Sequence, residues 1–163
     1  MTTDAERYVI DASVGIKLFV DEPLSDEAHE LFARLAENAA TRFYVPDLFY
    51  TECANILWKY VNRHGMPEAE ARRDLRRLDD LALDCVPTAH ILHPALRLAL
   101  RHGITVYDAT YVATARLVRA PLVTADERLI RAIGDKERLL LPLSTALEGK
   151  AGDQGEAEEA STN

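Results

Sequence analysis

Four acidic residues stand where their side chains could act together on one substrate. Asp11 ends a short apolar run, while Asp108 and Asp126 each follow an apolar run and open a predicted helix. Glu52 lies on the apolar face of the helix predicted over 47–63, where a carboxylate is costly unless it is paired or binds a metal. Each Asp alone also fits a helix N-cap, and Glu52 alone also fits the rim of the surface. The four together favour a shared site.

Carboxylates gathered at one point repel each other and take up protons unless a cation neutralises them. Mg²⁺ and Mn²⁺ are hard divalent cations that suit carboxylate and water ligands. Such ions generate hydroxide from water and stabilise an in-line displacement at phosphorus. The acidic residues therefore predict a metal-dependent phosphodiesterase. Asn55 follows Glu52 by three residues on the same side of its helix and is a candidate for orienting a water, although an ordinary polar helix residue fits equally well.

Alternating strands and helices must position these side chains. Apolar runs bounded by Pro, Gly and polar residues predict strands at 7–10, 42–45, 83–87, 104–106, 122–124 and 139–142. Periodic apolar stripes predict helices over 25–38, 47–63, 66–81, 91–102, 108–118 and 127–133, with Asp47 placed as a cap. This alternation predicts an α/β domain whose parallel sheet is covered on both faces. Ligands of such sheets collect at the carboxyl ends of the strands, where the three Asp residues stand.

Length and composition indicate one ordinary soluble domain. We expect the 163-residue chain to fold over 1–148 and to end in an acidic, disordered tail over 149–163, because the tail lacks apolar periodicity. No window approaches the roughly 18 consecutive apolar residues of a membrane span. The acidic N-terminus lacks the basic and apolar regions of a signal peptide. A cytoplasmic location without membrane association is therefore expected.

The net charge of −8 counts against a general affinity for polyanions. Residues 149–163 carry Lys150 against four acidic residues, so −3 lies in the tail and −5 remains for 1–148. A nucleic-acid binder usually shows a basic footprint. Binding of RNA by this chain therefore requires local arginines or bound cations that reverse the field.

Arginines are densest in the helix predicted over 66–81. The pairs Glu68–Arg72 and Arg76–Asp80 have opposite charges at i, i+4, which favours a solvated helix face over an RNA-facing row of arginines. Arg72, Arg76 and Arg128 are nevertheless candidates for positioning an RNA backbone.

Four segments of the chain carry a resemblance to a known family. They are VIDAS at 9–13, PDLFYTECANIL at 46–57, YDATYVATA at 107–115 and LVTADERL at 122–129. Through them the chain, over about residues 7–145, resembles the PIN-domain nucleases and in particular the VapC-like toxins of toxin–antitoxin pairs. Each motif alone is weak, whereas four in the right order with sensible spacing are fairly specific.

The resemblance implies roles for individual residues. Carried over position by position, the acidic quartet of the family, which is both catalytic and metal-binding, falls on four residues: Asp11, Glu52, Asp108 and Asp126. The polar residue that helps the quartet falls on Ser13 or Thr124, whose hydroxyl would hold a water.

The resemblance also implies a fold, an activity and partners. The implied fold is a three-layer α/β/α sandwich with a parallel sheet of four or five strands. The implied activity is Mg²⁺- or Mn²⁺-dependent endoribonuclease cleavage of single-stranded RNA by the toxin of a toxin–antitoxin pair. The implied partners are a small antitoxin and a second copy of the chain. Because aromatics are enriched at interfaces, Tyr50, Trp58 and Tyr60 are candidates for a partner surface, although core packing explains at least one of them better. The acidic tail after Glu148 is not part of the family pattern.

Two other functions compete with a nuclease. A phosphoacceptor signalling domain also gathers Asp residues around Mg²⁺ at strand ends, but it usually needs adjacent N-terminal acids and a late lysine, and neither is evident in this sequence. A PIN-like fold without catalysis would serve as a binding module. The intact quartet argues against that function, because a lost activity normally shows as a missing carboxylate.

Overall fold

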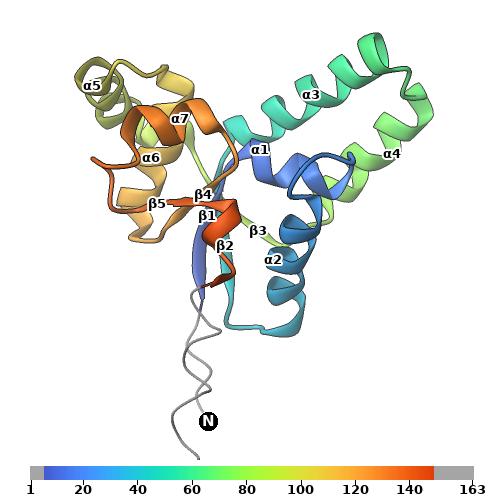
Figure 1. Ribbon diagram of the computed structural model, residues 1–163, viewed down its shortest axis with the longest axis horizontal. Coiled ribbons are helices and arrows are strands. Elements are labelled where there is room, and N and C mark those ends of the chain that lie inside the picture. Colours follow the sequence, from blue (N-terminus) through green and yellow to red (C-terminus); the bar gives the residue numbers. More distant parts are fainter. Residues whose placement is uncertain (1–5, 149–163) are drawn as a thin grey trace, which may run out of the picture.

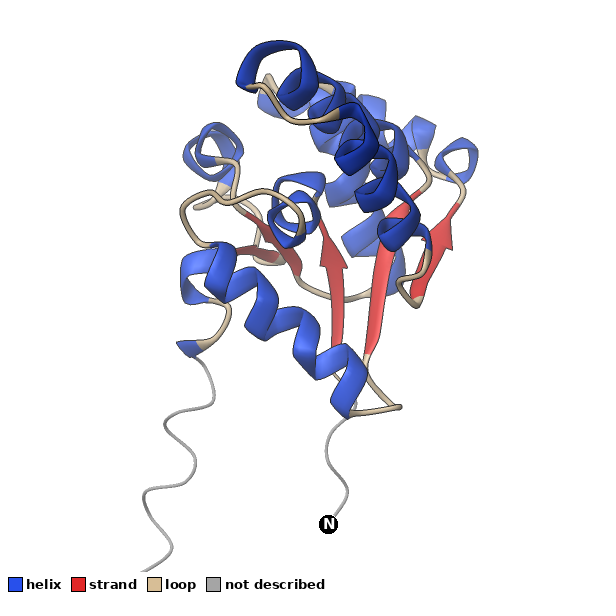
Figure 2. Cartoon of the chain, turned by 90° about the vertical axis from the view of Figure 1, so that its right-hand side faces the viewer, coloured by secondary structure: helices blue, strands red, loops and turns tan. Residues whose placement is uncertain are grey.

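Five short strands form one parallel sheet in the computed structural model, which describes residues 6–148. The strands are β1 (Arg7–Ile10), β2 (Arg42–Pro46), β3 (Leu83–Val86), β4 (Leu122–Thr124) and β5 (Leu140–Pro142), in the order β3-β2-β1-β4-β5. Figure 2 shows the strands side by side between helices, and all pair in parallel. Val9 of the central strand pairs with Tyr44 on one side and Leu122 on the other. The predicted parallel sheet is confirmed, with five strands.

Helices cover both faces of this sheet. They are α1 (Ala12–Gly15), α2 (Ser25–Glu37), α3 (Leu48–His64), α4 (Glu68–Asp79), α5 (Leu92–His102), α6 (Val106–Val118) and α7 (Glu127–Ile133), with short 3₁₀ turns η1 (Ile16–Leu18), η2 (Thr88–His90) and η3 (Leu143–Thr145). In Figure 1, α5, α6 and α7 lie to the left of the sheet and α1 and α2 to the right, while the α3–α4 hairpin projects away from it. This is the predicted three-layer α/β/α sandwich.

The most deeply buried helix is α6. It packs against β1, β2 and β4 on one side and against α5 on another, and its seven residues from Ala109 to Ala115 are all buried. These seven buried residues point in every direction around the helix, so this stretch of α6 lies in the interior of the domain. Its small alanine side chains let the backbone approach the sheet closely, so α6 is a rigid element on which a site can be built.

The strand predicted at 104–106 is wrong. The segment instead enters α6, which begins at Val106, and the Thr105 hydroxyl accepts a hydrogen bond from the backbone N–H of Asp108 at 3.0 Å. The β-branched residues suggested a strand, but the capping bond of Thr105 stabilises the first helical turn. Asp108 therefore lies in the first turn of a helix rather than at the end of a strand.

The predicted capping role of Asp47 is also wrong. Its side chain makes no capping hydrogen bond to α3. Its carboxylate instead accepts hydrogen bonds from the backbone N–H, at 3.2 Å, and the hydroxyl of Thr88. Asp47 therefore ties the start of α3 to the turn that follows β3.

Two further expectations concern the C-terminal tail and membrane association. The predicted tail over 149–163 lies outside the described residues, so the division into 1–148 and 149–163 stays a prediction. Across residues 6–148, none of the helices has the length and apolar character needed to cross a membrane.

Candidate metal and catalytic site

Asp11 is a buried carboxylate held by two hydroxyl groups. It follows β1, is 8% exposed, and accepts hydrogen bonds at Oδ2 from Thr124 Oγ1 at 2.5 Å and Ser13 Oγ at 2.9 Å. Asp11 occupies the N-cap position of α1, yet its side chain makes no capping bond. The simple capping explanation therefore fails for this residue, and its carboxylate is positioned by side chains from two different strand ends.

The two hydroxyls are themselves fixed by the backbone after β4. Ser13 Oγ accepts a hydrogen bond from the N–H of Ala125 at 3.0 Å, and Thr124 Oγ1 accepts one from the N–H of Asp126 at 3.1 Å. Thr124 is fully buried, and the two hydroxyl oxygens lie 3.4 Å apart. The carboxyl ends of β1 and β4 are thus joined by a polar network centred on Asp11.

Glu52 is brought to this edge by a close contact between two helices. A Cβ atom at Gly15 would lie 2.5 Å from the ring of Phe49, so only glycine lets α1 approach α3 this closely. One turn beyond Phe49, the half-buried Glu52 accepts a hydrogen bond from the hydroxyl of Tyr111, which is only 2% exposed. Tyr111 thereby connects α6 to α3 through the candidate catalytic carboxylate.

Asp108 approaches from the start of α6. It is half-buried, and its Oδ2 accepts a hydrogen bond from the Thr105 hydroxyl at 2.8 Å. The reciprocal bonds between Thr105 and Asp108 hold this carboxylate at the N-terminal end of the helix, where the helix dipole favours negative charge.

Three carboxyls share one electrostatic environment. Burial raises the pKa of Asp11, the two hydroxyl hydrogen bonds oppose this, and the charge of Asp108 adds to the rise. Burial also raises the pKa of Glu52, against the effect of its bond from Tyr111, and the charges of Asp11 and Asp108 raise it further. We call Asp11, Glu52 and Asp108 the acidic edge. Their mutual repulsion is what a bound cation would relieve.

Asp126 behaves differently from the other three acids. Its Oδ1 accepts hydrogen bonds from the N–H groups of Arg128, at 2.8 Å, and Leu129, at 3.3 Å, and so caps α7. Its Oδ2 lies 3.6 Å from the guanidinium of Arg128. The capping explanation therefore holds for Asp126, which lies next to Thr124 at the margin of the network.

The donor atoms match a divalent cation in type, although they do not form a closed site. Within residues 6–148, no three His, Cys, Asp or Glu side chains are arranged to hold a metal ion as they stand. The side chains of the acidic edge are directed toward hydroxyl donors, namely Thr124, Ser13, Tyr111 and Thr105. Oxygen donors and uncompensated negative charge are the features that Mg²⁺ and Mn²⁺ select.

The remaining predicted residues divide between inside and outside this network. Ser13 and Thr124 are part of it, whereas Asn55 is exposed on α3. Sequence reasoning missed Tyr111 and Thr105. Tyr111 follows Asp108 by one helical turn and therefore lies on the same side of α6, which was the available signal.

The sequence of this chain is similar to that of a known domain family and of several known proteins. A model of the PIN domain matches residues 8–135. Ribonuclease VapC3 of Pyrobaculum aerophilum is 38% identical over 125 residues, which are 76% of this chain and 92% of that protein. Ribonuclease VapC9 of Mycobacterium tuberculosis is 31% identical over 121 residues, 74% of this chain and 87% of that protein.

Solved structures show the same fold. The crystal structure of PAE2754 from Pyrobaculum aerophilum has a TM-score of 0.65 at 25% identity and covers 88% of this chain and 90% of that one. A toxin–antitoxin complex from Klebsiella pneumoniae has a TM-score of 0.57 at 17% identity, covering 83% and 97%. The crystal structure of VapBC2 from Rickettsia felis, bound to a DNA fragment from the VapBC2 promoter, has a TM-score of 0.58 at 14% identity. The match covers 83% of this chain and 98% of that one. At identities below 25%, the last two show similarity of fold.

Proposed function

The chain belongs to the PIN-domain family, as its resemblance predicted, and from that premise we propose that it is a divalent-metal-dependent endoribonuclease acting on single-stranded RNA. The relatives named ribonuclease VapC support nuclease activity and a role as the toxin of a toxin–antitoxin pair. The observation that carries the proposal is the acidic edge, where burial and mutual repulsion raise the pKa of the Asp11 and Glu52 carboxyls.

The proposed cation is Mg²⁺ or Mn²⁺, held by Asp11, Glu52 and Asp108, with Asp126 beside them. When bound, it would supply the positive charge that activates a water nucleophile and stabilises the leaving oxygen at phosphorus. The need for such a charge follows from the donor set, since unneutralised carboxylates would repel an RNA phosphate.

The residues around the acidic edge hold its carboxylates in place. Ser13 and Thr124 orient Asp11, and Tyr111 donates to Glu52. A hydroxyl that donates to a carboxylate fixes the orientation of that side chain and favours its charged form. These groups therefore pre-organise the site before a ligand binds. Asn55 stays a proposed water-orienting residue on the exposed side of α3.

Cleavage of a labelled single-stranded RNA tests this function directly. We expect cleavage with Mn²⁺ or Mg²⁺, none with EDTA, and none by the Asp11→Asn variant. Absence of cleavage by antitoxin-free protein at every metal concentration would contradict the enzyme and favour a binding module. Equal cleavage by the wild type and Asp11→Asn would reveal a contaminating nuclease.

The proposal includes a small antitoxin as partner. A groove of about 390 Å³ between α3 and α4 is lined by apolar side chains that include Leu57 and Val61, and Trp58 beside them is 57% exposed. Exposed apolar grooves of this kind mark protein interaction sites. Of the other two candidate aromatics, Tyr60 donates to Glu22 and Tyr50 packs edge-on against Phe49.

Co-expression tests this partner. The product of a short reading frame immediately upstream is expected to co-purify with the wild type and to be lost from Trp58→Glu. If the upstream product co-purifies equally with the wild type and with Trp58→Glu, the antitoxin binds elsewhere on the surface.

A second copy of the chain is the other proposed partner. Three leucines at four-residue spacing, Leu92, Leu96 and Leu100, leave an exposed apolar stripe along α5. A homodimer that meets along α5 would bury this stripe symmetrically. Sedimentation should show a dimer for the wild type and a monomer for Leu96→Glu, whereas a monomeric wild type at tens of micromolar contradicts the dimer.

A further inference from the structure

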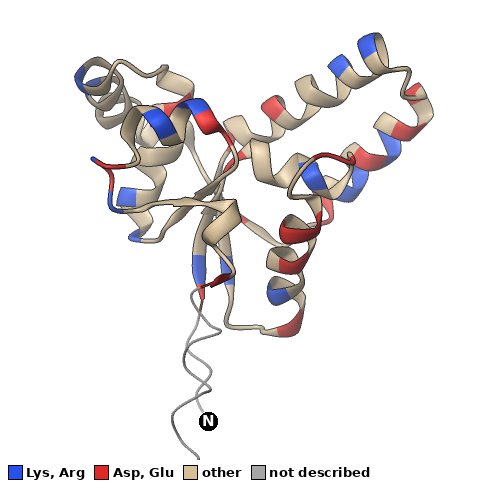
Figure 3. Cartoon of the chain, in the orientation of Figure 1, with Lys and Arg blue, Asp and Glu red and all other residues tan. Residues whose placement is uncertain are grey.

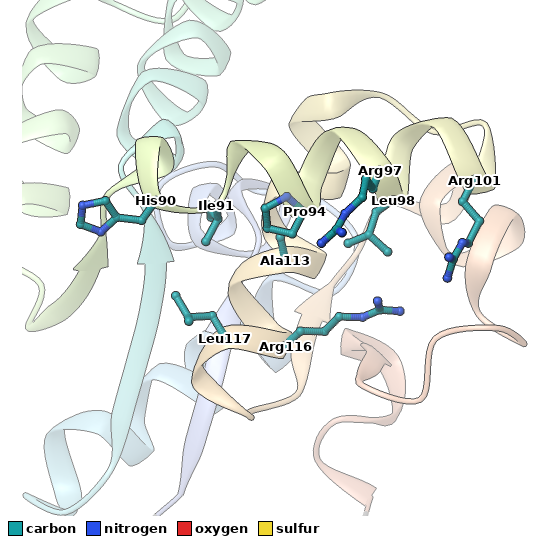
Figure 4. A pocket seen from close by; sticks show the side chains of 9 residues that line it. All are labelled: His90, Ile91, Pro94, Arg97, Leu98, Arg101, Ala113, Arg116 and Leu117. Atoms are coloured by element: carbon teal, nitrogen blue, oxygen red, sulfur yellow. The ribbon is translucent and has the colours of Figure 1, made fainter.

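A cavity between α5 and α6 lies outside the acidic edge and is lined by arginines. Its volume is about 530 Å³. Arg97 and Arg101 reach it from α5 and Arg116 from α6, while an apolar wall that includes Pro94 and Leu98 lies beside them. Figure 4 shows the three guanidinium groups in the same space between the two helices. We call this feature the arginine cavity.

The positive charge of the arginine cavity is not balanced. In the part of the chain that the structure describes, neither Arg97 nor Arg101 forms an ion pair, and their i, i+4 spacing makes their charges repel each other. Arg116 alone is paired, through Nε at 2.9 Å and Nη2 at 2.6 Å to the buried carboxylate of Glu137. Glu137 therefore compensates the charge of Arg116, whereas Arg97 and Arg101 have no carboxylate partner among residues 6–148.

The surrounding region is also positively charged. Residues 88–142 contain eight Lys and Arg against five Asp and Glu, a net +3, whereas residues 6–87 contain ten against sixteen, a net −6. Figure 3 shows blue segments on α5 and α7 and around the end of α6. The overall net charge conceals this difference, and the arginine cavity lies in the part that attracts anions.

We propose that the arginine cavity binds phosphate groups of the RNA strand, an inference that rests on the proposed function. Guanidinium groups bind phosphate oxygens in bidentate geometry, and an apolar wall accommodates a sugar or a base face. Arg116 follows Asp108 by eight residues on α6, which corresponds to about 12 Å along the helix axis. The inferred strand would therefore follow α6 from the acidic edge to the cavity.

The three arginines expected from the sequence are less available. Arg72 is paired with Glu68, and Arg128 lies near Asp126. Arg76 lies on the α3–α4 hairpin, within the acidic part of the chain. The arginine cavity is thus the better anion site among the described residues, because its charge is concentrated and uncompensated.

Binding of a fluorescent single-stranded RNA of about 12 nucleotides, in the Asp11→Asn background that prevents cleavage, tests this assignment. Replacing Arg97→Gln and Arg101→Gln together should weaken binding roughly twenty-fold at about 0.1 M salt and reduce the slope of log K against log salt by about 1.4. The matched control replaces Lys59→Gln and Arg63→Gln, two exposed basic residues at the same i, i+4 spacing on α3 and without ion pairs within residues 6–148, and should leave both quantities within about two-fold.

The outcomes separate this inference from the proposed function. If RNA affinity falls equally in both double variants, or falls in neither, the cavity is not an RNA site. If RNA binding is unchanged but a peptide with the sequence of residues 149–163 loses affinity, the cavity binds an acidic protein segment instead, which also overturns the inference. Cleavage by otherwise wild-type protein carrying the Arg97→Gln and Arg101→Gln changes should show a raised KM with kcat retained. Failure of wild-type cleavage alone would refute the nuclease without deciding the binding result.

Discussion

The acidic edge and the arginine cavity use opposite ends of α6 and opposite charges. Both gather like charges that repel each other, but they hold those charges differently. The carboxylate of Asp11 is buried and bonded to two hydroxyls, whereas Arg97 and Arg101 are exposed and unpaired within the described residues. Fixed, buried groups suit chemistry because they need no reorganisation, while exposed arginines supply affinity by attracting phosphate groups. The difference assigns catalysis to one region and binding to the other.

The largest expected effect separates these two tasks. Asp11→Asn should bring RNA cleavage below detection, a loss of at least about a hundred-fold in kcat/KM, because it removes a charge from the proposed metal ligands. RNA affinity, measured by fluorescence anisotropy, should stay within about two-fold. The exposed Asp21→Asn is the matched control and should leave both unchanged. A large loss of RNA affinity in Asp11→Asn would show that the acidic edge also binds the RNA, so the two regions would not have separate tasks.

A smaller effect is expected for the hydroxyls that position Asp11. Thr124→Val removes the donor at 2.5 Å, and we expect the Kd for Mn²⁺ to rise about ten-fold by calorimetry, with RNA affinity unchanged. Thr114→Val is the control, since among residues 6–148 this buried hydroxyl bonds only to the carbonyl of Thr110 on its own helix. Equal changes in both variants would indicate a general loss of packing rather than a role in metal binding.

The pH dependence of stability should also distinguish the two regions. Burial raises the pKa of Asp11 and Glu52 in the folded state, so the folded protein holds protons that the unfolded chain has released. The metal-free free energy of unfolding should therefore fall as the pH rises through the window above the ordinary pKa values of these carboxyls.

Urea unfolding in EDTA at about pH 5 and pH 7 measures this slope. Asp11→Asn should flatten it and stabilise the metal-free protein by about 1 kcal/mol at pH 7. The Arg97→Gln and Arg101→Gln double variant should keep the wild-type slope. A wild type that gains stability over the same range would show that the acidic edge carries no electrostatic strain.

The smallest functional effect is expected away from both regions. Tyr60 donates to Glu22, which also accepts a hydrogen bond from the buried Lys17 at 2.9 Å. Burial raises the pKa of Glu22, but these two bonds outweigh it and lower the pKa. Tyr60→Phe should cost about 1 kcal/mol of stability in thermal unfolding, with cleavage and RNA affinity unchanged. The exposed Tyr107→Phe should cost nothing, and a loss of cleavage in Tyr60→Phe would extend the site along α3 to Tyr60 and its partner Glu22.

The helices and the segments that lead into them show where prediction from the sequence succeeds and where it fails. The apolar periodicity of α2 and α5 predicted both helices to within about a residue, because local patterns set local structure. The segment 104–106 failed because the hydrogen bond between Thr105 and Asp108 overrides the strand preference of β-branched residues. The pair Arg76–Asp80 was predicted from spacing but is absent among the described ion pairs, whereas Glu68–Arg72 is present.

By itself the sequence determined most of the alternation of strands and helices, the covered parallel sheet that this alternation implies and the placement of Asp11 at a strand end. These features depend on patterns within a few residues of each other. Only the tertiary structure decided that Tyr111 supports Glu52, that Asp126 remains a helix cap and that Arg97, Arg101 and Arg116 surround one cavity. Such relations join distant segments, and their energies depend on burial and direction, which spacing along the chain does not encode.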